Sequence, residues 1–168
     1  WIAEQLGSAS VTIQTSASNA GSTETITVNG TVEIVWSAPT TLTLEAGRNI
    51  VMNPGALIEN THAGNNFDAI VLEAKGIGSG TYNGISMQNA ILRTTGSGNI
   101  SLTGKGGDTG QNNRGIYLYD GSRVESAGSG AAAGKVTLSG TGGAGPNRSY
   151  GIMIRGDATE VKSAHGAI

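Results

Sequence analysis

The chain contains 168 residues, of which 28 are glycine, 3 are proline and none is cysteine, so disulfides and thiolate zinc sites are excluded. Only 13% of the residues are charged, and a net charge of −2 with an isoelectric point near 5.6 excludes the basic surface that nucleic-acid binding requires. No apolar stretch approaches the roughly 20 residues that span a bilayer, and with 4% aromatic residues the core must consist of small aliphatic side chains.

The first 40 residues predict strands but follow no clear repeat. Short alternations of apolar and polar residues occupy residues 11–14, 24–28 and 32–36, and Asn29-Gly30 is typical of a tight turn. We expect residues 1–40 to form a divergent rung packed on the repeats that follow. No segment of the chain shows a convincing 3.6-residue pattern, so no helices of note are expected, and no polar cap is visible at either end.

Residues 41–168 contain an internal repeat. Gly84-Ile-Ser-Met recurs as Gly115-Ile-Tyr-Leu and Gly151-Ile-Met-Ile, 31 and then 36 residues further on, and Gly98-Asn-Ile-Ser-Leu recurs after 36 residues as Gly134-Lys-Val-Thr-Leu. Each phrase alternates apolar and polar residues, which indicates a strand. Three short strands per repeat, in rungs that begin near residues 42, 70, 100 and 136, predict an all-β fold: a right-handed parallel β-helix of four to five rungs. An antiparallel β-sandwich does not explain the shared register of the phrases.

The repeat defines three expected core stacks, in which one apolar position recurs in rungs about 4.8 Å apart. The first stack is Leu44, Leu72, Leu102 and Leu138; the second is Ile50, Ile85, Ile116 and Ile152; the third is Ile58, Leu92, Val124 and Val161. Gly84, Gly115 and Gly151 precede the second phrase, and they fit sharp corners that need a positive φ or a close backbone approach.

The connections within a rung differ in length. From the second stack to the third the gap is 8, 7, 8 and 9 residues, whereas from the first to the second it is 6, 13, 14 and 14. We expect the first kind to be tight corners and the variable kind, such as residues 105–114 and 141–150, to be loops in solvent. Because residues 166–168 resemble the start of a further rung and no cap follows, we expect the chain to continue or to stack on another copy.

The phrase Trp36-Ser-Ala-Pro-Thr-Thr-Leu-Thr-Leu-Glu-Ala-Gly-Arg-Asn-Ile and the later Gly-Ile-x-Leu and Val-x-Ser units resemble the coil repeats of filamentous-haemagglutinin-like proteins of two-partner secretion. The resemblance covers roughly residues 32–168 and concerns repeat style, not a catalytic motif. It implies a secreted or cell-surface bacterial fibre-like protein for adhesion, aggregation or a sheath. The implied partners are the same solenoid, an extracellular polysaccharide or another cell surface. The amino-terminal secretion domain of these proteins is not recognisable here.

A carbohydrate-active enzyme is the first alternative function, because two carboxylates about 5–9.5 Å apart can cleave a glycosidic bond. Asp120 and Asp157 both follow the second phrase, so they are candidates for a pair on adjacent rungs; with Arg123 and Arg155 nearby, a carboxylate–arginine ladder is the simpler interpretation. Neither an adjacent Asp-Asp nor a recurrent polar cluster occurs, so we expect no catalytic residue and no enzyme. The other carboxylates considered are Glu59, Asp68, Asp108, Glu125 and Glu160.

We also expect no metal site and no cofactor. His62 and His165 lie more than 100 residues apart in loop-like contexts, as solvated side chains do. Gly106-Gly-Asp-Thr-Gly lacks both the calcium-binding nonapeptide pattern and the Lys-Ser/Thr of a phosphate loop, which leaves a structural ion near Asp108 and Asn147 as an open alternative. The glycosylation-like triplets at Asn29, Asn99 and Asn147 are expected by chance in such a composition.

Outward-facing residues supply the remaining candidates. Tyr117 and Tyr119 alternate with apolar residues, so we expect them outside, where they or Tyr150 can contact a sugar or a neighbouring fibre. An ice-binding face is a second alternative function, suggested by outward Ser101, Thr103, Thr137 and Ser139, although Glu45 and Glu73 interrupt these columns.

Overall fold

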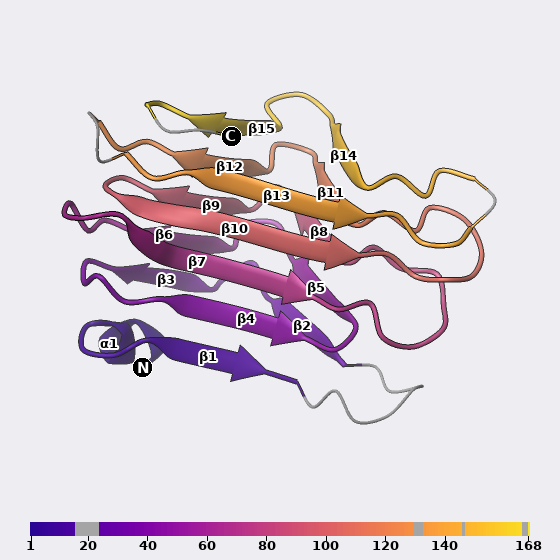
Figure 1. Ribbon diagram of the computed structural model, residues 1–168, viewed down its shortest axis with the longest axis horizontal. Helices are drawn as coiled ribbons and strands as arrows, with labels where there is room; N and C mark the ends of the chain where they lie inside the picture. Colours follow the sequence, from indigo (N-terminus) through magenta and orange to yellow (C-terminus); the bar gives the residue numbers. More distant parts are fainter. Residues whose placement is uncertain (16–23, 130–132, 146, 166–167) are drawn as a thin grey trace.

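The computed structural model describes residues 1–15, 24–129, 133–145, 147–165 and 168, in which one short helix precedes 15 strands. The strands form three parallel sheets of five, and consecutive strands of the chain belong to different sheets (Figure 1). Sheet A contains β1 (Val11–Gln14), β4 (Leu42–Ala46), β7 (Phe67–Ala74), β10 (Gly98–Lys105) and β13 (Val136–Thr141). Sheet B contains β2 (Thr25–Val28), β5 (Asn49–Met52), β8 (Ile85–Gln88), β11 (Ile116–Tyr119) and β14 (Ile152–Arg155). Sheet C contains β3 (Glu33–Trp36), β6 (Leu57–Asn60), β9 (Ile91–Thr94), β12 (Arg123–Ser126) and β15 (Glu160–Ser163).

The chain is a three-sided parallel β-helix of five rungs, which confirms the predicted fold class. Its path turns right-handed as it rises from β1 to β13, because sheet A runs across the front and the chain returns behind it through sheets B and C (Figure 1). The first rung is β1, β2 and β3. Two strands of sheet A, β7 and β10, begin slightly earlier than the periodicity indicated, at Phe67 and Gly98.

Aliphatic side chains in register fill the interior. Leu44 pairs with Leu72, and Leu102 pairs with both Leu72 and Leu138; the other two expected stacks lie in register in the same way. The first rung extends the stacks through Ile13, Ile26 and Ile34. Burial is complete in the middle rungs and lower at both ends: Ile13 and Ile26 of the first rung are partly buried, and Ile152 of the last rung is 42% exposed.

The corner between sheets A and B requires glycine because of close backbone packing. A Cβ on Gly115 would lie 2.4–2.7 Å from Thr141 N, Gly151 O and Gly104 O, and Gly84 and Gly151 are similarly crowded by backbone oxygens. These three glycines do not have a positive φ. The left-handed conformation occurs at the corner between sheets B and C, at Gly55, Asn89, Asp120, Gly121, Gly156 and Ala158. It also occurs within the long connections between sheets A and B, at Gly76, Gly78, Gly80, Gly110, Asn112 and Arg148.

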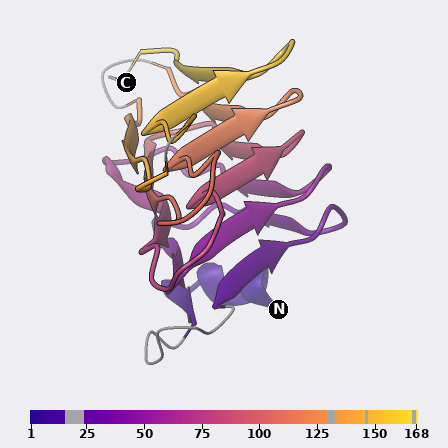
Figure 2. The same cartoon turned by 90° about the vertical axis from the view of Figure 1, so that its right-hand side faces the viewer.

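The two ends of the coil differ. Helix α1 (Ile2–Leu6) covers the N-terminal end: Leu6 is fully buried, Ile2 and Ala3 pack against the core, and Glu4 and Gln5 are exposed (Figure 2). No polar cap was expected at this end, whereas α1 covers it; a single helix of five residues leaves the all-β fold class unchanged. A helix this short cannot display a 3.6-residue pattern, so no periodic signal for it is present in residues 2–6.

The C-terminal end of the coil is open. Leu138, Ile152, Ile154, Val161 and Ile168 line an apolar cavity of about 360 Å³ there. The further rung predicted to begin at residue 166 falls largely outside the described residues. Among the residues that the structure describes, no helix has both the length and the apolar character needed to cross a bilayer.

Candidate functional site

The long connections between sheets A and B stack on one another as the strands do (Figure 1). Gly107 N donates to Tyr82 O (3.0 Å), and Gly143 N donates to Asn113 O (2.8 Å), so each loop is bonded to the loop of the rung below. The fully buried Asn113 accepts a hydrogen bond from Tyr82 N (3.0 Å) and donates to Thr109 O (2.7 Å). These loops were expected to lie in solvent, but their bases are part of the packed structure.

A polar groove of about 540 Å³ lies between these loops, lined by Ser79, Lys105, Asp108 and the backbone of several glycines. Asp108 is fixed in it, because its carboxylate accepts hydrogen bonds from Gly80 N (3.0 Å) and Ser79 Oγ (3.1 Å). These donors, with the Gly80 amide as the largest effect, lower the pKa of Asp108 below its ordinary value. The groove therefore offers one anion and one cation, while the amides of Gly76, Gly106 and Gly143 are already bonded within the coil.

The Asp108 contacts predict a pH effect. A carboxyl group whose pKa is lowered by folding contributes stability above its unfolded pKa and loses that contribution as the pH falls through the folded value. We therefore expect the melting temperature to fall as the pH is lowered below about 3.8, and to fall less for Asp108→Asn than for the wild type. Thermal unfolding between pH 6 and pH 2.5 measures this difference. Asp157→Asn, at an exposed corner, serves as the control, and equal pH profiles for wild type and Asp108→Asn would contradict the prediction.

The metal and histidine candidates do not come together. Within the described ranges, no group of three or more His, Asp or Glu side chains could hold a metal ion. Asn147 contacts the loop of the rung below through its backbone carbonyl oxygen, which accepts a hydrogen bond from Asn112 N (3.1 Å). His62 packs edge-on against Phe67, with ring centroids 5.5 Å apart, and its Nδ1 lies 3.0 Å from Ser37 O. His62 is thus a packing residue of a corner, and His165 is exposed.

Tyr117 and Tyr119 lie on the outer face of β11, above the buried Ile116 and Leu118. Their rings stack on each other with centroids 4.4 Å apart, and the Arg114 guanidinium lies 4.3 Å from the Tyr117 ring centre. Both faces of the Tyr117 ring are therefore occupied, which leaves it little surface for stacking on a sugar. Tyr150, in the loop before β14, is 51% exposed and keeps its ring accessible.

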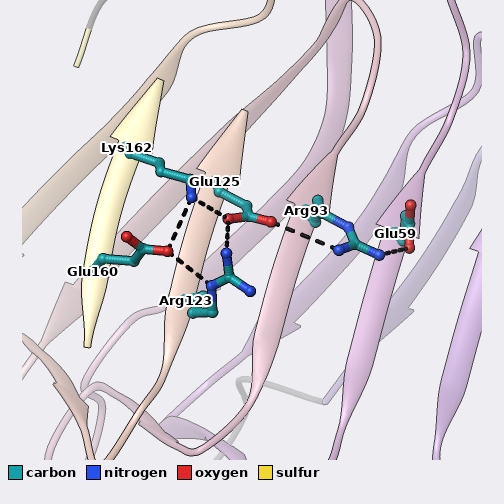
Figure 3. A network of polar contacts seen from close by, with 6 residues as sticks. All are labelled: Glu59, Arg93, Arg123, Glu125, Glu160 and Lys162. Carbon is teal, nitrogen blue, oxygen red and sulfur yellow. Dashed lines mark hydrogen bonds and ion pairs between the residues drawn. The ribbon is translucent and has the colours of Figure 1, made fainter. Parts of the chain in front are cut away.

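The most extensive polar arrangement lies on the outer face of sheet C (Figure 3). Register places Glu59, Arg93, Glu125 and Lys162 in one column across four rungs, so the charge changes sign at every step. Arg93 bonds Glu59 (2.6 Å) and lies 3.7 Å from Glu125, and Lys162 lies 3.1 Å from Glu125. We call this set, with Arg123 and Glu160 of the neighbouring column, the charge ladder.

Glu125 is the centre of the charge ladder. Its side chain is only 4% exposed, and it contacts Arg93, Arg123 and Lys162. The contact with Arg123 is 2.7 Å long, and Arg123 also bonds Glu160 at 2.8 Å. Hydrogen bonds from Lys162 and Arg123 lower the pKa of Glu160, and the Glu59 hydrogen bond raises the pKa of Arg93. Opposite charges therefore join all four upper rungs of sheet C.

Three of the carboxylates considered for catalysis, Glu59, Glu125 and Glu160, are thus engaged with cations. The ladder was expected near Asp120 and Asp157, but Arg123 pairs with Glu125 and Glu160 instead. Tyr119 pairs with Arg155, so the rung position above Asp120 is Gly156 and not Asp157. Asp120 accepts a hydrogen bond from Gln88 (3.1 Å), and Asp68 accepts one from Asn99 (3.2 Å). The signal for the ladder was present in the sequence, because the residues after Ile58, Leu92, Val124 and Val161 alternate in charge.

The outward columns of sheet A are mixed. Register places Glu45, Glu73, Thr103 and Ser139 in one column, and Thr43, Val71, Ser101 and Thr137 in the other. Lys75 forms an ion pair with Glu45 at the end of this face. The two glutamates therefore interrupt the threonine and serine column at two adjacent rungs.

We expect Glu125→Gln to lower the free energy of unfolding by about 1–3 kcal/mol, because it leaves three neighbouring cations without their shared anion. The estimate is below that for a fully buried pair, since the cations are 31–45% exposed and can recover hydration. Urea unfolding measures the change. Glu33→Gln, at an exposed position of β3 in the same sheet, should change stability by less than about 0.5 kcal/mol. Equal effects of the two substitutions would show that the ladder adds nothing to stability.

Comparisons with protein-family models, with curated proteins and with solved structures found no match to this chain.

Proposed function

We propose that the chain is a structural and adhesive segment of a large secreted or cell-surface bacterial protein, similar in role to the filamentous-haemagglutinin-like proteins that its repeats resemble. The observation that carries the proposal is the five-rung coil, in which three parallel sheets and the aliphatic stacks continue through every rung, with one register shift between Asn99 and Ile100. Each rung contacts mainly its neighbours, so such a coil is a rigid element whose length grows with the number of repeats.

The proposal includes no enzymatic activity. Glu59, Glu125 and Glu160 each form ion pairs with neighbouring cations, and these contacts occupy their carboxylate oxygens. Asp108 has a lowered pKa, the opposite of what a general acid at neutral pH needs. A structural role accounts for these contacts without a substrate.

Localisation tests the proposal directly. An antibody raised against the chain, used for immunogold electron microscopy on intact cells that produce the protein, should label the cell surface or extracellular filaments. Brief protease treatment of intact cells should remove that label, while a cytoplasmic marker stays protected. Labelling that requires permeabilised cells would overturn the proposal.

Carbohydrate binding is a second candidate, favoured by the groove between the stacked loops. Its Lys105 ammonium, Asp108 carboxylate and glycine backbone can bond hydroxyl groups, and Tyr150 on the last of these loops has an accessible ring. Binding of the chain to a panel of immobilised bacterial and host polysaccharides tests it. A polysaccharide that binds in the groove should bind more weakly to Lys105→Ala and equally well to Lys135→Ala. Lys135 precedes β13, at the opposite end of the sheet A strands from Lys105.

A further inference from the structure

The outer face of sheet C carries two columns of side chains that run along the coil. Register places Glu33, Leu57, Ile91 and Arg123 in the first column, and Val35, Glu59, Arg93 and Glu125 in the second. Figure 3 shows the charged members of the second column, with Arg123, on this face. The face lies along the side of the coil, so further rungs at either end would lengthen it and not cover it.

The first column is apolar in the middle and oppositely charged at its two ends. Leu57 and Ile91 flank core residues on their strands, so they point outward, and both are partly exposed. Val35, in the second column, is 45% exposed. Glu33 is exposed, and the Arg123 side chain is 35% exposed. Burying the apolar side chains of this face against a partner is favourable.

We propose that two copies of this chain associate side by side through the outer faces of sheet C, with the two coils running in opposite directions. The twofold axis lies along the strand direction, midway between β6 and β9, so the first rung of one copy faces the fourth rung of the other. Such an interface is isologous, because both copies use the same surface. It goes beyond the proposed function, since it needs only the chain itself and holds wherever the protein is located.

The first column is complementary to itself in this arrangement. Glu33 faces Arg123 of the second copy, and Leu57 faces Ile91 of the second copy. The symmetry repeats both contacts, so two ion pairs flank two apolar contacts. Opposite charges around an apolar centre are the pattern that fixes the register of an interface.

The second column fits as well. Glu59 faces Arg93 of the second copy, and these side chains also have opposite charges. Val35 faces Glu125 of the second copy. Because the Glu125 carboxylate is already bonded to three cations of its own chain, this contact buries no unpaired charge.

Other registers of the same two faces bring unfavourable contacts. An axis at β6 would place Glu59 against Glu59 of the second copy, and an axis at β9 would place Arg93 against Arg93, and such like-charge contacts are costly. Moving the axis by a full rung in either direction would place Leu57 against a glutamate, Glu160 or Glu33. The side chains therefore favour a single register.

Two coils running in the same direction would also fit poorly. The twofold axis would then lie along the coil, and each column would face the other column of the second copy. Leu57 would lie against Glu59, and Ile91 against Arg93, so charged groups would lose hydration against apolar side chains. The pattern of the two columns therefore favours opposite directions.

The contact is small, so we expect a weak dimer. The strands involved have four residues each, and the paired faces measure about 13 Å along the strands and about 14 Å along the coil. This is well below the roughly 800 Å² per partner of a standard interface. The dissociation constant is therefore expected in the micromolar range or above.

Sedimentation equilibrium of the chain, from micromolar to millimolar concentration, should show a monomer–dimer equilibrium. Leu57→Lys and Ile91→Glu each place a charge against an apolar side chain at two symmetric contacts, and each alone should weaken dimerisation roughly tenfold or more. Mixed in equal amounts, the two variants should form a heterodimer. The introduced lysine then faces the introduced glutamate, and the remaining isoleucine and leucine face each other. Recovery in the mixture also shows that both variants are folded.

Val71→Lys is the matched control, because Val71 is a partly exposed apolar residue on the outer face of sheet A. It should leave dimerisation unchanged. A monomer at millimolar concentration, no heterodimer in the mixture, or an equal loss of dimer with Val71→Lys would each overturn the proposal.

Cross-linking tests the direction of the two coils. The chain has no cysteine, so Leu57→Cys and Glu33→Cys each introduce a single thiol. Across the proposed axis the two thiols lie one rung apart for Leu57→Cys, but three rungs apart, about 14 Å along the coil, for Glu33→Cys. A short bismaleimide should therefore join copies of Leu57→Cys and not copies of Glu33→Cys. Equal cross-linking of both variants would indicate coils in the same direction and overturn the proposal.

Discussion

Replacing Leu102 by alanine is expected to lower the free energy of unfolding by about 2–5 kcal/mol, the range for a fully buried leucine. Leu102 is 0% exposed and pairs in register with Leu72 below and Leu138 above. The backbone around it is fixed by ladders on both sides, so the coil cannot collapse into the space left by the side chain. At about 2–4 °C per kcal/mol for a chain of this size, the melting temperature should fall by roughly 4–20 °C.

Leu138→Ala is the matched control for this prediction. It deletes the same atoms from the same stack, but Leu138 lines the open cavity at the last rung, and its side chain is only partly buried. Less apolar surface is lost to water there, so the cost should be less than half that at Leu102. Chemical unfolding of both variants, followed by circular dichroism, gives the comparison. Equal losses would mean that the interior is not organised as a stack of rungs.

Gly115→Ala is expected to cost about 3 kcal/mol, at the upper end of overpacking effects. An added Cβ would lie 2.4–2.7 Å from backbone atoms of Thr141, Gly151 and Gly104. Two of these residues belong to the rung above, so relief of the clash requires the rungs to separate and their hydrogen bonds to lengthen. Glycine is needed here for space and not for its freedom in φ, so every larger residue should be at least as harmful as alanine.

Gly151→Ala tests the same corner with fewer neighbours. Its added Cβ would meet only Gly140, at 2.5 Å from the carbonyl oxygen, because the structure describes no rung above it. The last rung can tilt away, so we expect a loss of about 1 kcal/mol, near the low end of overpacking effects. Thermal unfolding measures both variants. A loss at Gly151 as large as at Gly115 would rule out crowding from two rungs as the cause.

The strands and their register were predictable from the sequence because each rung repeats the same local constraint. An aliphatic residue such as Leu72 must face inward, and its neighbours must then face outward, so the period of two appears in every phrase. The stacks follow once the phrases are aligned. The charge ladder was predictable too, because Arg93 and Glu125 each follow a core residue of the third aligned stack. It was missed because only the apolar positions of the repeat were aligned, and not the charged positions beside them.

Other features were not predictable because they depend on contacts between distant segments. Helix α1 is too short for a periodic pattern, and it is held by the core that Leu6 covers. The loops between sheets A and B look solvated as sequence, yet Asn113 is buried because the neighbouring loops supply its hydrogen-bond partners. Arg123 pairs with Glu125, two residues along the same strand, and with Glu160, its register partner on β15, in place of the aspartates at the corner. Only the pairing with Glu160 depends on the register between distant strands.

Because charge alternates along sheet C, the number of rungs that can be deleted or inserted without bringing like charges together is restricted. Deleting the third rung, which contains Arg93, would bring Glu59 against Glu125, two like charges at one step of the sheet. Deleting the third and fourth rungs together would bring Glu59 against Lys162 and restore attraction. The same holds for insertions. A repeat protein of this kind can lose or gain rungs without a charge conflict only in pairs, so the unit of its growth is two turns of the coil and not one.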